Sequence, residues 1–194
     1  MKDITFNEIR LVLRILKSPE EDYNANNLSK VLSISPMGAL KIAKRLVKEE
    51  VLTSRQIGKG IFYSINFKNP YAKQYLQFLL KREGEYSAPY IKRWISEIRK
   101  IKNSELAILF GSVLSKSETA KDIDVLFVVS QKIFNELKKE IGQINRMNDK
   151  KIHPVFQSIQ DIKDNIKKQD KVVLNAIKGI VIFGEDTLLE VIEK

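Results

Sequence analysis

Hydrophobic residues in the first fifty positions recur at the spacing of amphipathic helices. Thr5 and Glu8 form a capping box, in which the hydroxyl caps a helix and the carboxylate reaches back to its start. Apolar positions then follow at helical spacing, at Phe6, Ile9, Val12, Leu13 and Leu16. Two more helices are predicted, one starting within 24–27 and one running from Pro36, after Ser35 as N-cap, to about Glu50.

After residue 51 the pattern changes to short alternating strands. Segments 53–57 and 61–67 flank Gly58-Lys59-Gly60, a sequence typical of a hairpin tip. Asn69-Pro70 ends this region and starts another helix, which reaches Gly84. A further helix is predicted over 90–101, and its apolar and aromatic positions favour packing in a core.

Three helices followed by a β-hairpin resemble a winged helix-turn-helix domain, over residues 1–68. The resemblance implies that the helix starting at Pro36 lies in the major groove of double-stranded DNA. The residues expected to face DNA are Met37, Gly38, Lys41, Lys44, Arg45 and Lys48 on the helix, and Arg55 and Lys59 on the hairpin. Winged helices also mediate protein contacts, so that alternative stays open. The helix within 69–86 is expected to be a linker or a homodimer interface.

Charge supports a polyanion-binding first half. The net charge is +10, and residues 1–70 carry 12 basic and 7 acidic side chains, residues 71–105 carry 8 and 4, and residues 106–194 carry 14 and 13. The segment 36–68 alone holds 7 basic and 2 acidic residues, so the excess coincides with the elements that would meet phosphate. A solvated Lys-rich surface is the simpler alternative.

Cysteine content and the length of apolar runs indicate in which cellular compartment the protein is expected. The chain has no cysteine, which excludes disulfides and thiolate metal sites. No apolar run reaches the length of a membrane span, and the first residues carry charges, unlike a signal peptide. We therefore expect a soluble, cytoplasmic protein without a membrane partner.

The second half is organised around two apolar runs that carry polar residues at their ends. The first run, 106–110, ends at Gly111-Ser112, and the second begins at Asp122 and Asp124. The pattern predicts strand, tight turn, short helix, strand. Two carboxylates spaced two apart share one face of a strand and favour a bound divalent cation, for which oxygen ligands suit Mg²⁺. A Gly-Ser turn before a helix offers N–H groups and a hydroxyl to a phosphate.

The Phe110-Gly111-Ser112 and Asp122-Ile123-Asp124 motifs resemble the signature of the DNA polymerase β-like nucleotidyltransferases, especially the minimal ones. The resemblance covers about the last ninety residues, with the domain expected over 87–194. It implies that Gly111 and Ser112 hold a nucleoside triphosphate and that Asp122 and Asp124 bind Mg²⁺ or Mn²⁺. The implied reaction transfers a nucleotidyl group to a hydroxyl and releases pyrophosphate. The expected fold class is α+β, with a small mixed sheet and helices mainly on one side.

The chain departs from the family at the third carboxylate. The strand expected over 152–156 carries His153, the chain's one histidine, where the family has an acidic residue. Three roles remain open for His153: general base, member of a binding site that turns over slowly or not at all, or structural hydrogen-bond partner. The turn region also has Lys116 and Lys121 where many minimal members carry an Arg and a second Gly.

Two competing interpretations follow from the same residues. In one, the protein is a transcriptional regulator whose second domain is an inactive nucleotide sensor or a partner-binding surface. In the other, as in minimal members of the family, it pairs with a helical partner protein in a toxin–antitoxin module. The sequence does not decide between these readings and an active transferase.

Overall fold

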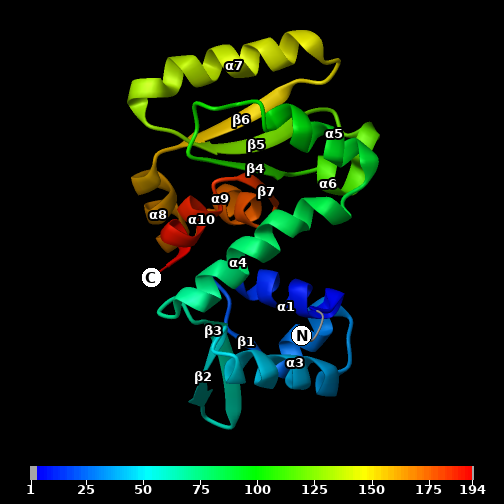
Figure 1. The fold of residues 1–194 in the computed structure, drawn as a ribbon, viewed down its shortest axis with the longest axis vertical. Coiled ribbons are helices and arrows are strands. Elements are labelled where there is room, and N and C mark those ends of the chain that lie inside the picture. Colours follow the sequence, from blue (N-terminus) through cyan, green and yellow to red (C-terminus); the bar gives the residue numbers. More distant parts are fainter. Residues whose placement is uncertain (1–3, 194) are drawn as a thin grey trace. The chain divides into compact units, whose positions relative to one another are not determined.

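A computed structural model of the chain describes residues 4–193, which form two compact units (Figure 1). The first unit is Met1–Leu79 and the second is Leu80–Lys194. The boundary falls inside one helix, α4 (Pro70–Glu83), so the predicted linker segment 69–86 straddles it. Within residues 4–193, no helix has both the length and the apolar character needed to cross a membrane.

The first unit combines helices with a small antiparallel sheet of order β1-β3-β2. Its elements before α4 are α1 (Phe6–Leu16), β1 (Tyr23–Asn24), α2 (Ala25–Leu32), α3 (Pro36–Lys48), β2 (Leu52–Ile57) and β3 (Gly60–Ile65). The three predicted helices and the hairpin are confirmed, and the two-residue strand β1 is an addition. This order is the layout of a winged helix-turn-helix, with α2 and α3 as the helix pair and β2–β3 as the wing.

Local capping explains where α2 and α3 begin. The Asn24 side chain accepts the N–H groups of Asn26 and Asn27 at 2.9 and 3.0 Å, and the Asn27 side chain accepts the Asn24 N–H at 2.8 Å. Ser35 caps α3 by accepting the Gly38 N–H at 3.0 Å, and a proline occupies the first helical position. These starts agree with the sequence-based prediction.

The core of the first unit is built from the inner faces of its helices and the base of the wing. Apolar side chains that are at most 1 % exposed are Leu11, Val12, Leu16, Leu28, Ala39, Ala43, Leu46, Val51, Leu52, Ala72, Leu76 and Leu79. Strand β2 leaves this core after Leu52, because its remaining residues are exposed, whereas Tyr63 and Ile65 of β3 stay buried. The hairpin tip is therefore free to meet a partner.

The second unit contains a four-stranded sheet of order β6-β5-β4-β7. The strands are β4 (Leu106–Phe110), β5 (Ile123–Val128), β6 (Ile152–Gln157) and β7 (Ile180–Phe183). β4 pairs antiparallel with β5 and β7, whereas β5 and β6 run parallel. The predicted small mixed sheet is confirmed, as is the strand–turn–short helix–strand order around Gly111.

Helices cover both faces of this sheet, which corrects the expectation that they pack mainly on one side (Figure 1). α5 (Pro89–Ile98) and α7 (Phe134–Met147) lie on one face. α8 (Ile159–Lys167), α9 (Lys171–Ile177) and α10 (Glu185–Ile192) lie on the other. An amphipathic pattern shows that a helix has an inner side but not which face of the sheet that side meets, so the sequence could not settle this point.

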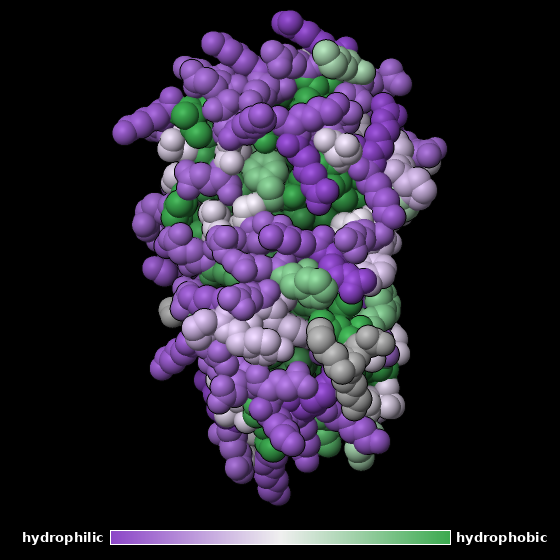
Figure 2. Space-filling model, in the orientation of Figure 1, coloured by the Kyte–Doolittle hydropathy of each residue, from purple (hydrophilic) through white to green (hydrophobic). Residues whose placement is uncertain are grey.

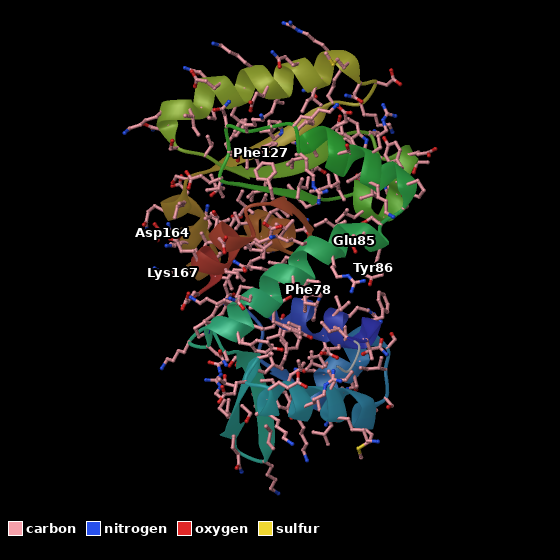
Figure 3. All side chains as sticks on the ribbon, in the orientation of Figure 1. Phe78, Glu85, Tyr86, Phe127, Asp164 and Lys167 are labelled. Carbon is pink, nitrogen blue, oxygen red and sulfur yellow. The ribbon has the colours of Figure 1, made fainter. Side chains whose placement is uncertain are left out.

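Alternate residues of β5 point to opposite layers, and Phe127 points to the α5–α7 layer (Figure 3). Its buried ring lies 6.3 Å from that of Phe156, which meets the Phe134 ring edge-on at 4.8 Å. These three rings join β5, β6 and α7. They hold the strands that carry Asp124 and His153 against one helix.

The outer edge of β6 is partly closed by a side chain of α7. The Ile152 N–H donates to Asn145 Oδ1 at 2.7 Å, and Asn145 Nδ2 donates to the Ile152 carbonyl at 3.5 Å. Two residues further on, Pro154 has no N–H to offer. His153 lies between these two residues on the strand.

Candidate functional site

The turn after β4 brings its backbone against a carboxylate of β5. Gly111 has a φ of +79°, and a Cβ there would lie 2.2 Å from Asp124 Oδ2. Only glycine combines this backbone conformation with so close an approach. Phe110 pairs with Asp124 in the β4–β5 register, so the carboxylate lies beside the turn. The structure thus brings together two of the predicted site residues, Gly111 and Asp124.

Asp124 also contacts the imidazole of His153. The β5–β6 register sets the two residues side by side, and His153 Nδ1 lies 3.1 Å from Asp124 Oδ1. The expected strand over 152–156 is confirmed, and it sets His153 beside Asp124. A carboxylate can only accept, so in the neutral ring Nδ1 carries the proton and Nε2 is the acceptor. The His153 side chain is 71 % exposed, against 27 % for Asp124, so Nε2 is open to a reactant.

Asp122 lies outside the strand, in the bend before β5, and is exposed. The alternation argument that set Asp122 and Asp124 on one strand face therefore does not apply, because β5 begins at Ile123. Among the described residues, no three or more His, Asp or Glu side chains gather closely enough to hold a metal ion. Mg²⁺ needs only one or two carboxylates when phosphate oxygens complete its shell, and Asp124 offers that kind of donor.

Ser112 follows Gly111 at the start of α6 (Val113–Lys116) and is half-buried. Its carbonyl accepts the Lys116 N–H at 2.8 Å, and its side chain does not cap the helix. The loop that follows is held by Lys150, whose ammonium donates to the carbonyls of Glu118 and Ala120. No sequence pattern marks Lys150, because these contacts join distant parts of the chain.

The predicted DNA-facing residues of α3 divide into two groups. Met37, Lys41, Lys44 and Lys48 are exposed and follow one another at steps of four, three and four, so they form a single stripe along the helix. The stripe lies opposite the buried Ala39, Ala43 and Leu46. We call these four residues the α3 stripe. Three of its members are cations.

The wing carries the other two predicted contacts. Lys59 lies at the hairpin tip beside Gly58, whose φ is +57°. Arg55 is 64 % exposed, and its guanidinium contacts Asp22 at 2.7 Å. Lys59 is therefore a more available cation than Arg55, which already has an acidic neighbour.

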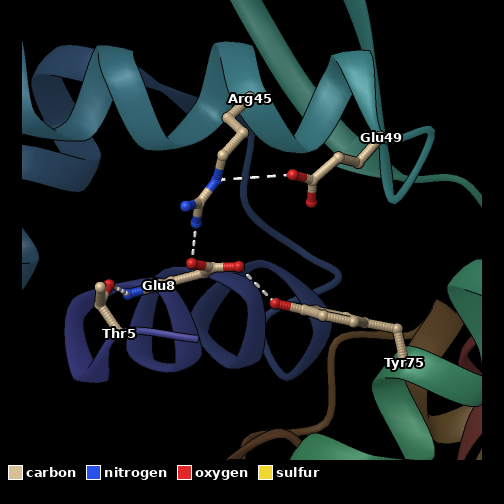
Figure 4. A network of polar contacts seen from close by, with 5 residues as sticks. All are labelled: Thr5, Glu8, Arg45, Glu49 and Tyr75. Atoms are coloured by element: carbon tan, nitrogen blue, oxygen red, sulfur yellow. Dashed lines mark hydrogen bonds and ion pairs between the residues drawn. The ribbon is translucent and has the colours of Figure 1, made fainter. Parts of the chain in front are cut away.

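Gly38 and Arg45 lie beside the α3 stripe rather than on it. Gly38 is half-buried and donates its N–H to Ser35. The Arg45 side chain is 25 % exposed and forms an ion pair with Glu8 of α1, and its Nε lies 3.8 Å from Glu49 (Figure 4). The expectation that Arg45 points outward is wrong, because its guanidinium neutralises a carboxylate that is 2 % exposed.

The same carboxylate accepts a hydrogen bond from α4. The Tyr75 hydroxyl donates to Glu8 Oε1 at 2.5 Å (Figure 4). Burial raises the pKa of Tyr75 to about 12, although the nearby Arg45 lowers it in part. Glu8 thus ties α3 and α4 to α1, which fixes the orientation of the α3 stripe within the first unit.

Comparisons with known proteins give no family. No family model matches the chain, and no curated protein matches it. Among solved structures, the adhesin competence repressor AdcR of Streptococcus pyogenes is 16 % identical, with 52 % of this chain and 69 % of that chain covered and a TM-score of 0.37. A variant of Lactococcus lactis ZitR is 18 % identical, with 50 % and 72 % covered and a TM-score of 0.32. These likenesses are weak.

The class of each unit is therefore taken from its own geometry. The first unit has the element order of a winged helix-turn-helix domain with an exposed basic stripe on its second motif helix. The second is an α+β unit in which a glycine turn, a carboxylate and an imidazole meet at neighbouring strands.

Proposed function

We propose that the first unit binds double-stranded DNA and that the protein acts as a transcriptional regulator. The α3 stripe carries the proposal: Lys41, Lys44 and Lys48 project from one face of the helix that this layout lays in the major groove. Lys59 adds a cation at the tip of the wing. Lysines contact phosphates as point charges, so most of the affinity is electrostatic and depends on salt.

The experiment is a titration of the full chain against a labelled duplex at several salt concentrations. Replacing Lys41, Lys44 and Lys48 by Gln should lower the slope of log affinity against log salt by about 2 to 3, since each lost phosphate contact removes about 0.9. The matched control replaces Lys167, Lys168 and Lys171, three exposed cations of the second unit. Equal slopes in the two triple variants would exclude the α3 stripe as the DNA surface.

A second candidate function belongs to the second unit, which we propose binds a nucleoside triphosphate with Mg²⁺. The approach of Gly111 to Asp124 favours it, because a turn without a side chain leaves its backbone open beside a carboxylate. Asp124, together with Asp122 in the preceding bend, would supply carboxylate oxygens to the metal. When bound, Mg²⁺ would neutralise phosphate charge. Gly111 and Ser112 would face the phosphates.

Whether such a site could catalyse nucleotidyl transfer, and not only bind a nucleotide, depends on His153. With Nδ1–H donated to Asp124, its exposed Nε2 is placed to accept a proton from a hydroxyl acceptor. Asp124 would then orient the imidazole and stabilise its protonated form. This arrangement supports nucleotidyl transfer to a hydroxyl, whereas a site without it would act as a nucleotide sensor.

Binding and transfer are separated by one series of measurements. Asp124→Asn should weaken Mg²⁺-dependent binding of nucleoside triphosphates by about tenfold or more. Glu136→Gln, which removes an exposed carboxylate from α7, should leave it unchanged. Label transferred from a nucleotide and lost in the Asp122/Asp124 double variant would show an enzyme, and saturable binding without transfer would show a sensor. Undiminished Mg²⁺-dependent affinity in Asp124→Asn would contradict the site itself.

A further inference from the structure

The two helical layers of the second unit carry opposite charge. Segments 89–103 and 131–149, which include α5 and α7, hold 9 basic and 4 acidic residues, a net charge of +5. The segment 158–193, which includes α8, α9 and α10, holds 5 basic and 7 acidic residues, a net charge of −2. Residues 80–194 together carry 21 basic and 17 acidic side chains, a net charge of +4, so the positive charge of the unit lies mainly in the first of these layers. We call the positive side the α5–α7 face.

The cations of the α5–α7 face are all exposed. They are Lys92, Arg93, Arg99, Lys100 and Lys102 on or just after α5, and Lys132, Lys138, Lys139 and Arg146 on or just before α7. Lys92, Ser96 and Arg99 follow one another at steps of four and three, so they share one outward side of α5. Hydrophilic side chains dominate the surface over α7 (Figure 2).

Internal contacts leave much of this positive charge uncompensated. Arg93 donates to the Asn148 side chain at 3.0 Å and Arg99 to the Ile182 carbonyl at 3.5 Å, both of which are neutral acceptors. These bonds hold the guanidinium groups in place without cancelling their charge. Lys100, in contrast, is paired with Glu97 at 2.7 Å.

One of the four carboxylates on this face, Glu140, bonds to backbone N–H groups rather than to a cation. Glu140 accepts the N–H groups of Lys102 and Asn103 at 3.2 and 3.1 Å and the Asn103 side-chain amide at 2.9 Å. These neutral donors leave the Glu140 charge in place, so with Glu97 paired to Lys100 the acidic side chains that moderate the face are Glu136, Glu140 and Asp149. An excess of fixed cations over available carboxylates attracts a polyanion.

The composition of the face favours nucleic acid over a protein partner. A protein interface needs an apolar centre, but among the described residues Met147 is the one large apolar side chain exposed on these two helices. Trp94 is buried, and the Lys138 ammonium covers the Phe134 ring at 4.4 Å, so neither ring is available to stack on bases. Cations without exposed aromatics contact phosphates and read no sequence.

We propose that the α5–α7 face binds the backbone of a nucleic acid, which gives the chain a polyanion-binding surface separate from the α3 stripe. The inference goes beyond the proposed function, since it needs neither DNA binding by the first unit nor nucleotide binding at Gly111 and Asp124. The ligand is recognised by its phosphates, so affinity should be insensitive to sequence and steeply dependent on salt.

The experiment titrates the full chain with a labelled duplex of arbitrary sequence between about 50 and 200 mM salt. A first variant replaces Lys92, Arg93 and Arg99 by Gln, and a second replaces Lys132, Lys139 and Arg146. The matched control replaces Lys167, Lys168 and Lys171 on the opposite layer, where Lys167 lies on α8 (Figure 3). Each variant removes three exposed cations, and the fluorescence of the buried Trp94 reports whether the second unit stays folded.

The proposal expects a salt slope lower by about 2 to 3 in a folded α5 or α7 variant and an unchanged slope in the control. Slopes equal to the control in both variants would overturn it, as would binding of an acidic protein surface in place of nucleic acid. The α3 variant distinguishes the two proposals. A lower salt slope in the α5 variant with an unchanged slope in the α3 variant would refute DNA binding by the first unit and leave this inference standing.

Discussion

The Tyr75 hydroxyl donates a 2.5 Å hydrogen bond to Glu8, a carboxylate that is 2 % exposed and also paired with Arg45. A buried charge that loses a partner keeps its desolvation cost. Tyr75→Phe should therefore lower the free energy of unfolding of the first unit by about 1 to 3 kcal/mol. Urea denaturation followed by far-UV circular dichroism measures the change. Tyr71→Phe, at a position 52 % exposed, should shift it by less than about 0.5 kcal/mol.

The same tyrosine predicts a loss of stability in alkali. Burial raises the pKa of Tyr75 to about 12 in the folded state from 10.0. The unfolded chain therefore releases this proton first, so the contribution is complete below pH 10 and is lost as pH rises toward 12. The loss should be on the order of 2 kcal/mol.

The check compares urea midpoints of wild type and Tyr75→Phe across that pH range. The advantage of the wild type should shrink as pH rises, because the variant lacks the titrating group. Burial also raises the pKa of Tyr63, but that residue is present in both proteins and cancels in the comparison. A constant difference would contradict the assignment.

Arg45 should contribute to the stability of the first unit rather than to DNA binding. Arg45→Met leaves the Glu8 carboxylate buried without its cation and should cost about 3 kcal/mol. Lys44→Met, one residue away on the α3 stripe, should leave stability within about 0.5 kcal/mol and weaken DNA binding. Thermal melts and duplex titrations of both variants would test this division. A stable Arg45→Met protein with weakened DNA binding would return Arg45 to the DNA surface.

Gly111 and Asp124 should show coupled effects on stability. Gly111→Ala sets a Cβ 2.2 Å from Asp124 Oδ2 and also strains a φ of +79°, so it should destabilise the second unit. In an Asp124→Ala background the carboxylate is gone and only the strain remains. A double-mutant cycle should therefore give a coupling energy above about 0.5 kcal/mol. Additive effects would show that the two residues do not touch.

The tautomer of His153 can be read directly, because the chain has one histidine. In the neutral imidazole, the bond to Asp124 should hold the proton on Nδ1. Nitrogen chemical shifts of the ring at alkaline pH report which nitrogen carries it. Asp124→Asn should shift the population toward the Nε2–H form, while Glu136→Gln should not. A wild-type ring already protonated mainly on Nε2 would exclude the proposed geometry.

Sequence reasoning succeeded where structure depends on neighbouring residues. Ser35 and Pro36 start α3 through contacts within one turn, so their pattern was sufficient. His153 was found through the family resemblance, which implies an acidic residue on the strand after the Asp-containing one, and the β5–β6 register pairs it with Asp124. The start of α3 thus needed only local sequence, whereas His153 needed the resemblance.

Prediction from the sequence failed where the partner of a side chain lies far away along the chain. Thr5 accepts the Glu8 N–H at 3.3 Å as the capping box requires, but the Glu8 side chain turns inward to Arg45 and Tyr75 instead of reaching back. Arg45 looked like an outward cation for the same reason. The partners lie on other helices, and no local pattern in the sequence shows which helices will meet.

Asn145 and Pro154 have a consequence for how copies of the chain can associate. A bare strand edge offers alternating donors and acceptors that a second molecule can extend, which is how fibrils begin. At the β6 edge the Ile152 groups are occupied by Asn145, and Pro154 offers no donor. The β6 edge is thus a poor template for strand addition, which favours association of this protein through side-chain surfaces over growth of a shared sheet at β6.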